Sequence, residues 1–286
     1  MPRHAIYKSA AGEAAIKSKY NDLLRHWPVE KEELQIATRH GNTFVIACGN
    51  PHSPPVLLLH GSGTNSIIWL RDVETLCRSH RVYAVDIIGE PNHSDPARPP
   101  TKGPAYAEWL EDLISELRIN KVKLVGVSLG AWMCLKFACA WPERVDRLIL
   151  MCPAGIVRER FWFKVETLLL LLLLGPLGKR ILYRHIRKGA DINPKFADYS
   201  RFVFKHFKPR LANLPRFSQK QLSQLYCPIL LIVGAKDVFY SPQKMLLRLA
   251  RAVPQLEINY RPRDGHLLTT CTREIDRFLL TEYPPE

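Results

Sequence analysis

The feature that most constrains the fold is a serine between two glycines, at the end of the apolar run VKLVGV (122–127). The segment GVSLG (126–130) has the pattern G-x-S-x-G, and helix-forming residues follow it. When this pattern joins a strand to a helix through a sharp turn, it is typical of a nucleophile elbow. Strand and helix approach each other closely there, which explains glycine at both ends. The pattern predicts that Ser128 is a nucleophile; the alternative is a packing turn.

Short apolar runs alternate with helical patterns along most of the chain. Continuous apolar runs are typical of strands covered on both faces, and strand–helix alternation predicts a mainly parallel sheet with helices on both faces. Strands are expected at residues 34–38, 43–48, 55–60, 82–86, 122–127, 147–152 and 229–234, and a last one in LEINYRPRDGHLL (256–268) before His266. Helices are expected at 69–77, 104–117, 129–141 and 242–253. The fold class is therefore α/β, with an eight-stranded sheet whose first two strands form an antiparallel hairpin.

The alternation stops after the sixth expected strand. Residues 154–225 contain no comparable strand pattern; they are helix-compatible, basic and interrupted by four prolines. We interpret this segment as a helical insertion, or cap. The core is then expected to comprise residues 1–153 and 226–286.

A nucleophilic serine needs a base, and the base needs an orienting acid. Asp237 follows the end of a buried strand by a few residues, and His266 follows the last expected strand. These positions predict Asp237 as the acid and His266 as the base. The alternatives are a turn carboxylate preceding a helix and a loop histidine. Asp264 is a weaker candidate acid, because it lies too near His266 in the sequence.

The tetrahedral intermediate of acyl transfer needs two hydrogen-bond donors for its oxyanion. The amide of Leu129 is expected to be one, and Ser62 in the turn HGSG (60–63) the other. His60 is expected to shape this turn rather than to act as a base. The residues expected to line the substrate pocket are His60, Gly61, Trp69, Trp132, Phe161 and Trp162.

Basic charge is concentrated in the insertion. Residues 158–220 contain fifteen Lys and Arg but four acids, so they carry +11 of the formal net charge of +14. The segment includes seven consecutive leucines (168–174), but its uncharged stretch is shorter than the roughly 20 residues that span a bilayer. We expect a helix buried against the core or lining a pocket. The alternative is weak contact between this basic, leucine-rich segment and an anionic membrane surface.

Other partner classes have little support in the sequence. No nucleic-acid-binding motif accompanies the basic segment, so no nucleic-acid partner is expected. No His, Cys, Asp or Glu cluster has metal-ligand spacing, so no metal or other cofactor is expected. The seven cysteines lack C-x-x-C spacing, and the N-terminus lacks an apolar signal region. We therefore expect a cytoplasmic protein, with a peripheral position at the inner membrane face as the alternative. The oligomeric state is left open.

Several of these segments together resemble the α/β-hydrolase superfamily over nearly the whole chain, and within it small carboxylesterase-type serine hydrolases with a helical cap. The resemblance is carried by LLLHGSGTNSIIW (57–69), VYAVDIIGEPNHSD (82–95), LVGVSLGAW (124–132), PERVDRLILMCPAG (142–155), LLIVGAKDVFYSP (230–242) and DGH (264–266), with Trp27-Pro28. It implies the same triad of Ser128, Asp237 and His266, the same oxyanion donors, and an insertion that covers the acyl pocket.

The chain departs from the family pattern at two positions. Ala131 stands where relatives often have glycine, and Asn92 stands where many have glycine in a turn. The nucleophile is serine rather than aspartate, which argues against dehalogenase or epoxide-hydrolase chemistry. The expected function is hydrolysis of carboxylic esters with small to medium hydrophobic groups. The alternatives are a thioesterase, a lactonase or a C–C hydrolase on the same scaffold, and a non-catalytic binding protein.

Overall fold

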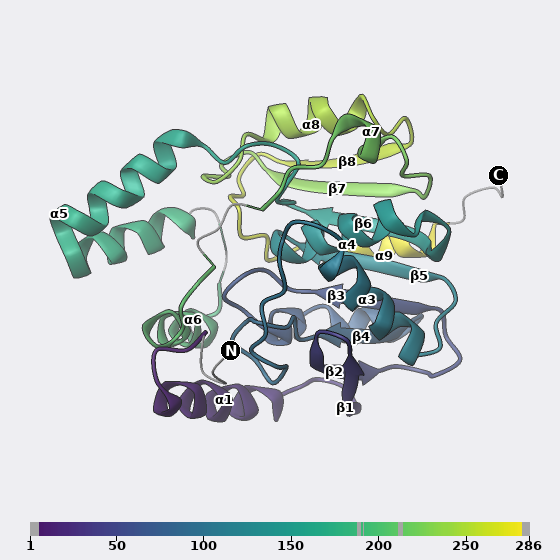
Figure 1. The fold of residues 1–286 in the computed structure, drawn as a ribbon, viewed down its shortest axis with the longest axis horizontal. Coiled ribbons are helices and arrows are strands. Elements are labelled where there is room, and N and C mark those ends of the chain that lie inside the picture. Colours follow the sequence, from purple (N-terminus) through teal and green to yellow (C-terminus); the bar gives the residue numbers. More distant parts are fainter. Residues whose placement is uncertain (1–5, 188–189, 191, 211–213, 282–286) are drawn as a thin grey trace.

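The computed structural model describes residues 6–187, 190, 192–210 and 214–281 (Figure 1). The strands form one eight-stranded sheet with the order β1-β2-β4-β3-β5-β6-β7-β8. The strands are β1 (Lys31–Thr38), β2 (Gly41–Cys48), β3 (Pro55–Leu59), β4 (Arg81–Val85), β5 (Val122–Val127), β6 (Val145–Met151), β7 (Ile229–Gly234) and β8 (Leu256–Arg261). β1 and β2 form an antiparallel hairpin, β2 is antiparallel to β4, and the remaining pairs are parallel. The predicted α/β sheet is confirmed.

Helices cover both faces of the sheet, because successive strand residues point to opposite sides. In β3, Leu57 and Leu59 pack in one hydrophobic cluster and Val56 and Leu58 in the other. The first face is covered by α3 (Ala105–Glu116), α4 (Leu129–Ala140) and α8 (Pro242–Ala250). The second is covered by α1 (Ala10–Leu24), α2 (Val73–Leu76) and α9 (Thr272–Leu280). The predicted arrangement of helices on both faces is confirmed.

The segment between β6 and β7 is helical. It contains α5 (Phe161–Ile186), α6 (Pro194–His206) and α7 (Gln219–Leu222), and its described residues form no strand. α5 is not straight: Gly175 has φ 45° and ψ −116°, and the helix folds back there into two arms (Figure 1). The arms touch, since a Cβ added at Gly178 would lie 1.8 Å from the carbonyl oxygen of Leu170.

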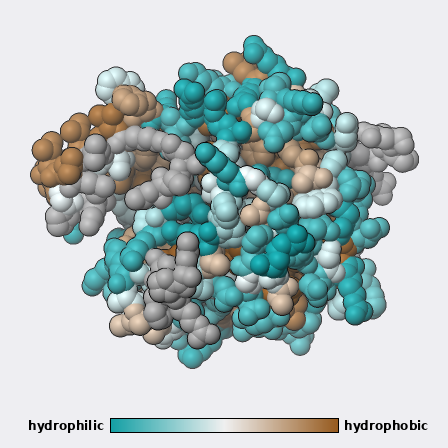
Figure 2. Space-filling model, viewed as in Figure 1, coloured by the Kyte–Doolittle hydropathy of each residue, from teal (hydrophilic) through white to brown (hydrophobic). Residues whose placement is uncertain are grey.

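The two arms of α5 extend away from the sheet and expose apolar side chains (Figure 2). Leu172 is 71% exposed, Leu173 75% and Leu177 54%. Burial of the leucine run against the core, expected from its composition, therefore does not hold for Leu172 and Leu173. No helix in the described part of the chain is long and apolar enough to cross a bilayer.

Candidate active site

Ser128 lies at a strained turn between β5 and α4. Its φ of 51° and ψ of −102° lie outside the usual regions for a residue with a side chain. The turn brings the two elements into contact: a Cβ added at Gly126 would lie 2.5 Å from the amide nitrogen of Ala131. A Cβ at Gly130 would lie 2.2 Å from the carbonyl oxygen of Leu59. Only glycine fits at these two positions, and the turn presents the Ser128 side chain at the carboxyl edge of the sheet.

Three side chains from distant parts of the sequence meet at this edge. His266 Nε2 lies 3.1 Å from Ser128 Oγ, and His266 Nδ1 lies 2.8 Å from Asp237 Oδ2. A carboxylate only accepts, so Nδ1–H donates to Asp237 and Nε2 is free to accept from the serine hydroxyl. The rings of Phe239 and His266 pack edge to face with centroids 4.6 Å apart. A histidine that accepts from a serine hydroxyl while an acid holds its other ring nitrogen is the arrangement that can activate such a hydroxyl as a nucleophile.

The loop after β7 keeps Asp237 ionised although the side chain is only 2% exposed. Burial acts to raise its pKa, but His266 and the amides of Phe239 and Tyr240 outweigh burial and lower the pKa below its usual value. Asp237 Oδ1 accepts from the Phe239 amide at 2.7 Å and from the Tyr240 amide at 3.1 Å. The carboxylate therefore stays charged at neutral pH and fixes the orientation of the imidazole.

The turn after β3 lies beside the serine. A Cβ added at Gly61 would lie 3.9 Å from Ser128 Cβ, so the backbone of this turn borders the reaction site. Leu129 is the first residue of α4, and the first amides of a helix have no partner within it. In the described structure, no residue accepts a hydrogen bond from the Ser62 amide. These two amides are therefore available to an oxyanion.

Glu90, which the sequence patterns do not single out, holds the turn after β3 through hydrogen bonds. It is fully buried, and its Oε2 accepts from the Gly63 amide at 2.7 Å and from Ser62 Oγ at 3.3 Å. Burial raises the pKa of its carboxyl group, while Arg210, at 3.7 Å from Oε1, acts in the opposite direction. The only sequence signal was its place in the segment DIIGEP. Glu90 holds the turn that carries Ser62.

Both ring nitrogens of His60 are engaged with the backbone around the turn. Its Nε2 accepts from the Ile87 amide at 2.9 Å, and its Nδ1 lies 2.8 Å from the carbonyl oxygen of Gly61. Complete burial lowers the pKa of His60 to about 4, so the ring is neutral at physiological pH. His60 thus connects the turn to the segment that follows β4.

Cys152 lies next to the acid and the base. Among the described residues, Cys152, Asp237 and His266 are the one group of three or more candidate metal ligands whose ligand atoms converge, within 4.8 Å of one another. Asp237 and His266 are already hydrogen-bonded to each other, and burial raises the thiol pKa well above its usual value. A neutral thiol and an engaged pair make a poor metal site. Sequence spacing could not reveal this group, because only folding brings β6, β7 and β8 together.

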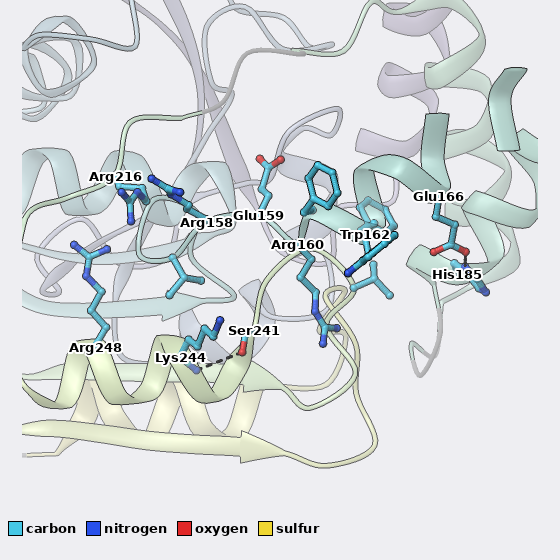
Figure 3. A pocket seen from close by; sticks show the side chains of 14 residues that line it. Arg158, Glu159, Arg160, Trp162, Glu166, His185, Arg216, Ser241, Lys244 and Arg248 are labelled. Carbon is cyan, nitrogen blue, oxygen red and sulfur yellow. Dashed lines mark hydrogen bonds and ion pairs between the residues drawn. The ribbon is translucent and has the colours of Figure 1, made fainter. Parts of the chain in front are cut away.

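A separate pocket of about 950 Å³ lies between the start of α5 and α8 (Figure 3). Phe161 and Trp162 line it, whereas Ser128, Asp237 and His266 do not. Two other residues expected in a pocket have different positions: Trp69 and Trp132 are buried in the two hydrophobic clusters on opposite faces of the sheet. The Trp132 indole donates to the Pro215 carbonyl at 2.9 Å. These tryptophans stabilise the fold because they fill its core.

Comparison with known proteins agrees with this geometry. Residues 56–275 match the α/β-hydrolase family. The protein belongs to this family, and its carboxylesterase relatives, described next, show that it is a carboxylesterase-like hydrolase.

Two curated relatives from Bacillus subtilis (strain 168) are similar over most of the chain. One, named uncharacterized carboxylesterase nap, is 32% identical over 263 residues, which cover 87% of this chain and 85% of the relative. Carboxylesterase YbfK is 29% identical, covering 87% and 86% of the two chains. The crystal structure of naproxen esterase (carboxylesterase NP) from Bacillus subtilis has a TM-score of 0.83 at 27% identity, covering 95% of this chain and 99% of that one.

Proposed function

We propose that the protein is a serine hydrolase that cleaves carboxylic esters with small to medium hydrophobic groups through an acyl-enzyme on Ser128. The observation that carries the proposal is the continuous chain of short contacts from Ser128 Oγ to His266 and from His266 to Asp237. The family membership and the carboxylesterase names of the relatives support it.

The reaction follows from the positions of these atoms. Ser128 Oγ attacks the ester carbonyl carbon while His266 Nε2 takes the hydroxyl proton, and Asp237 stabilises the imidazolium that forms. The amides of Ser62 and Leu129 donate to the oxyanion of the tetrahedral intermediate. When the intermediate collapses, its C–O bond to the alcohol breaks and His266 gives its proton to the leaving alkoxide. Water then releases the acid by the same steps in reverse.

We assign residues 154–225 to a cap over the acyl pocket and residues 1–153 and 226–286 to the core. α6 supports this assignment, since a Cβ added at Gly63 would lie 3.2 Å from the Phe204 ring. An apolar side chain of the insertion thus borders the turn that carries Ser62. This position favours substrates with a hydrophobic acyl or alcohol group.

The test of the proposed function is a panel of p-nitrophenyl esters of graded acyl length, with thioesters and lactones of matched size. We expect ester turnover and covalent labelling of Ser128 by a fluorophosphonate, located by peptide mass spectrometry. Faster turnover of thioesters or lactones would reassign the substrate class. Absence of both labelling and turnover would favour a non-catalytic binding protein.

Glu90 offers a prediction about the turn that carries Ser62. In Glu90→Ala the Gly63 amide loses its buried acceptor, so the oxyanion donor is less well positioned. We expect kcat to fall by about 10- to 100-fold with little change in KM, because the hydrogen bond to the oxyanion is made in the transition state and not in the bound substrate. Glu90→Gln keeps an acceptor oxygen and is expected to restore much of kcat. Equal losses in both variants would mean that the charge matters and not the hydrogen bond.

We also propose that the exposed leucines of α5 contact an anionic lipid surface. Leu172, Leu173 and Leu177 face solvent, and the second arm carries exposed Arg180 and Arg184. Apolar side chains flanked by cations are complementary to a bilayer with anionic headgroups. A second copy of the chain is a less suitable partner, since the segment's charge of +11 would repel itself.

Co-sedimentation with vesicles measures this contact. Binding to phosphatidylglycerol vesicles is expected at low salt, and it should weaken several-fold at high salt and in Leu172→Gln/Leu173→Gln. The control is Leu247→Gln, which removes a 60% exposed leucine of α8. No binding to anionic vesicles at low salt would refute the proposal. Leucine-dependent dimers in gel filtration would instead assign the surface to a second copy.

A further inference from the structure

The pocket between α5 and α8 has an unbalanced charge. Four cationic side chains contribute to its lining: Arg158 before α5, Arg216 before α7, and Lys244 and Arg248 on α8. In Figure 3 the four lie together on one side of the pocket. They come from three separate segments of the chain, so folding and not local sequence brings them together.

These cations are not neutralised by carboxylates. Within the described residues, no carboxylate forms an ion pair with Arg158, Arg216, Lys244 or Arg248. Arg248 donates to the carbonyl oxygens of Ile156 and Phe217. Its pKa is lowered by burial and, further, by the charge of Arg216. Cations that face one another without a counter-charge are stabilised when an anion binds between them.

Both acids that line the pocket have interaction partners. Glu166 pairs with His185 at 2.9 Å, on the far side of the pocket from Arg216 (Figure 3). Glu159 also has an interaction partner of its own. The fifth cation, Arg160, donates to the carbonyl oxygen of Asp237 at 3.1 Å. The side of the pocket with the four cations is therefore left positive.

The pocket also has an apolar wall. Phe161 is 69% exposed and Trp162 77% exposed, and Phe163 completes the aromatic lining. A ligand that satisfies both sides must carry an anionic group and an apolar chain. A phosphate suits the cations better than a carboxylate, because its oxygens accept from several charged donors in different directions.

We propose that this pocket binds the phosphate group of an amphiphilic ligand, with the apolar chain against the aromatic wall. Ser128, Asp237 and His266 do not line this pocket, although Val238, the neighbour of Asp237, does. The N-terminus of α8 adds to the positive potential of the pocket. Ser241 caps this helix and also lines the pocket, so the positive end of the helix dipole lies beside it. The phosphate can be presented by a dissolved molecule or by a lipid headgroup.

The test measures binding of n-decyl phosphate, below its micelle concentration, by titration calorimetry on the Ser128→Ala protein. Ester hydrolysis plays no part in this readout, so its result is independent of the proposed function. We expect binding that is lost by at least tenfold in Arg216→Gln/Lys244→Gln, since charge-assisted hydrogen bonds are removed. Lys220→Gln is the matched control: it removes an exposed cation of the same insertion that does not line the pocket.

Two further ligands make the outcome decisive. Decyl glucoside has the same chain without charge, and phosphatidic acid vesicles present the phosphate in a bilayer. Binding of vesicles but not of the dissolved phosphate, with the same dependence on Arg216 and Lys244, would assign the source to a lipid headgroup. Equal binding of decyl phosphate and decyl glucoside, no binding of either phosphate ligand, or equal binding by all variants would overturn the proposal.

Discussion

Ser128→Ala is expected to reduce kcat for an aryl ester by about four to six orders of magnitude. The alanine side chain has no oxygen to attack the carbonyl carbon, so no acyl-enzyme forms. His266 and Asp237 keep their hydrogen bond, which depends on Nδ1 and not on the serine. Residual hydrolysis above the uncatalysed rate is expected, because the oxyanion donors and substrate binding remain.

The measurement compares initial rates of p-nitrophenyl ester hydrolysis in the two proteins at equal folded concentration. Circular dichroism should show unchanged unfolding, since the substitution neither fills nor empties the core. Ser115→Ala, on the exposed side of α3, is the matched control and should retain full activity. A Ser128→Ala protein with more than about a tenth of the original kcat would remove Ser128 from the reaction.

Much of the fold was predictable because the local spacing of apolar residues indicates the individual strands and helices. Residues 122–127 and 229–234 were expected as strands from their continuous apolar character, and both match the observed bounds. The helix expected at 129–141 ends one residue earlier. Such segments are buried on both faces, so the sequence pattern and the tertiary environment agree.

Other parts were not predicted. The large apolar residues of α1, Ile16, Tyr20, Leu23 and Leu24, do recur at helical spacing, but the contacts of this helix depend on tertiary packing: Tyr20 is buried and donates to Asp86 at 2.9 Å. In the sequence Glu90 resembles an ordinary turn residue, and only the fold brings its carboxylate to the Gly63 amide, from which it accepts a hydrogen bond. The exposed leucines were misjudged for a similar reason: hydrophobicity favours burial, but only the fold decides whether a surface is present to bury them.

Replacement of the elbow glycine Gly130 by alanine is expected to destabilise the protein strongly. Alanine normally stabilises a helix relative to glycine by about 0.5–1 kcal/mol. At Gly130, the second residue of α4, the sign is expected to reverse because the new Cβ would lie 2.2 Å from the carbonyl oxygen of Leu59 and 2.7 Å from that of His60. Both atoms belong to backbone at the sheet edge, which cannot rotate away. Gly130→Ala should lower the free energy of unfolding by about 3 kcal/mol or more, measured by urea denaturation.

Two controls separate this clash from a general effect of substitution near the site. Gly61→Ala adds the same carbon where its nearest contact is 3.8 Å, so its stability should stay within about 1 kcal/mol of the original. Ala131→Gly removes a methyl from the next residue of the same helix and should cost about 1 kcal/mol through helix propensity. If Gly130→Ala were as stable as the parent protein, α4 and β3 would have to be farther apart than the elbow requires. The strained conformation that presents Ser128 would then rest on the close contact at Gly126 alone, where an added Cβ would lie 2.5 Å from the amide nitrogen of Ala131.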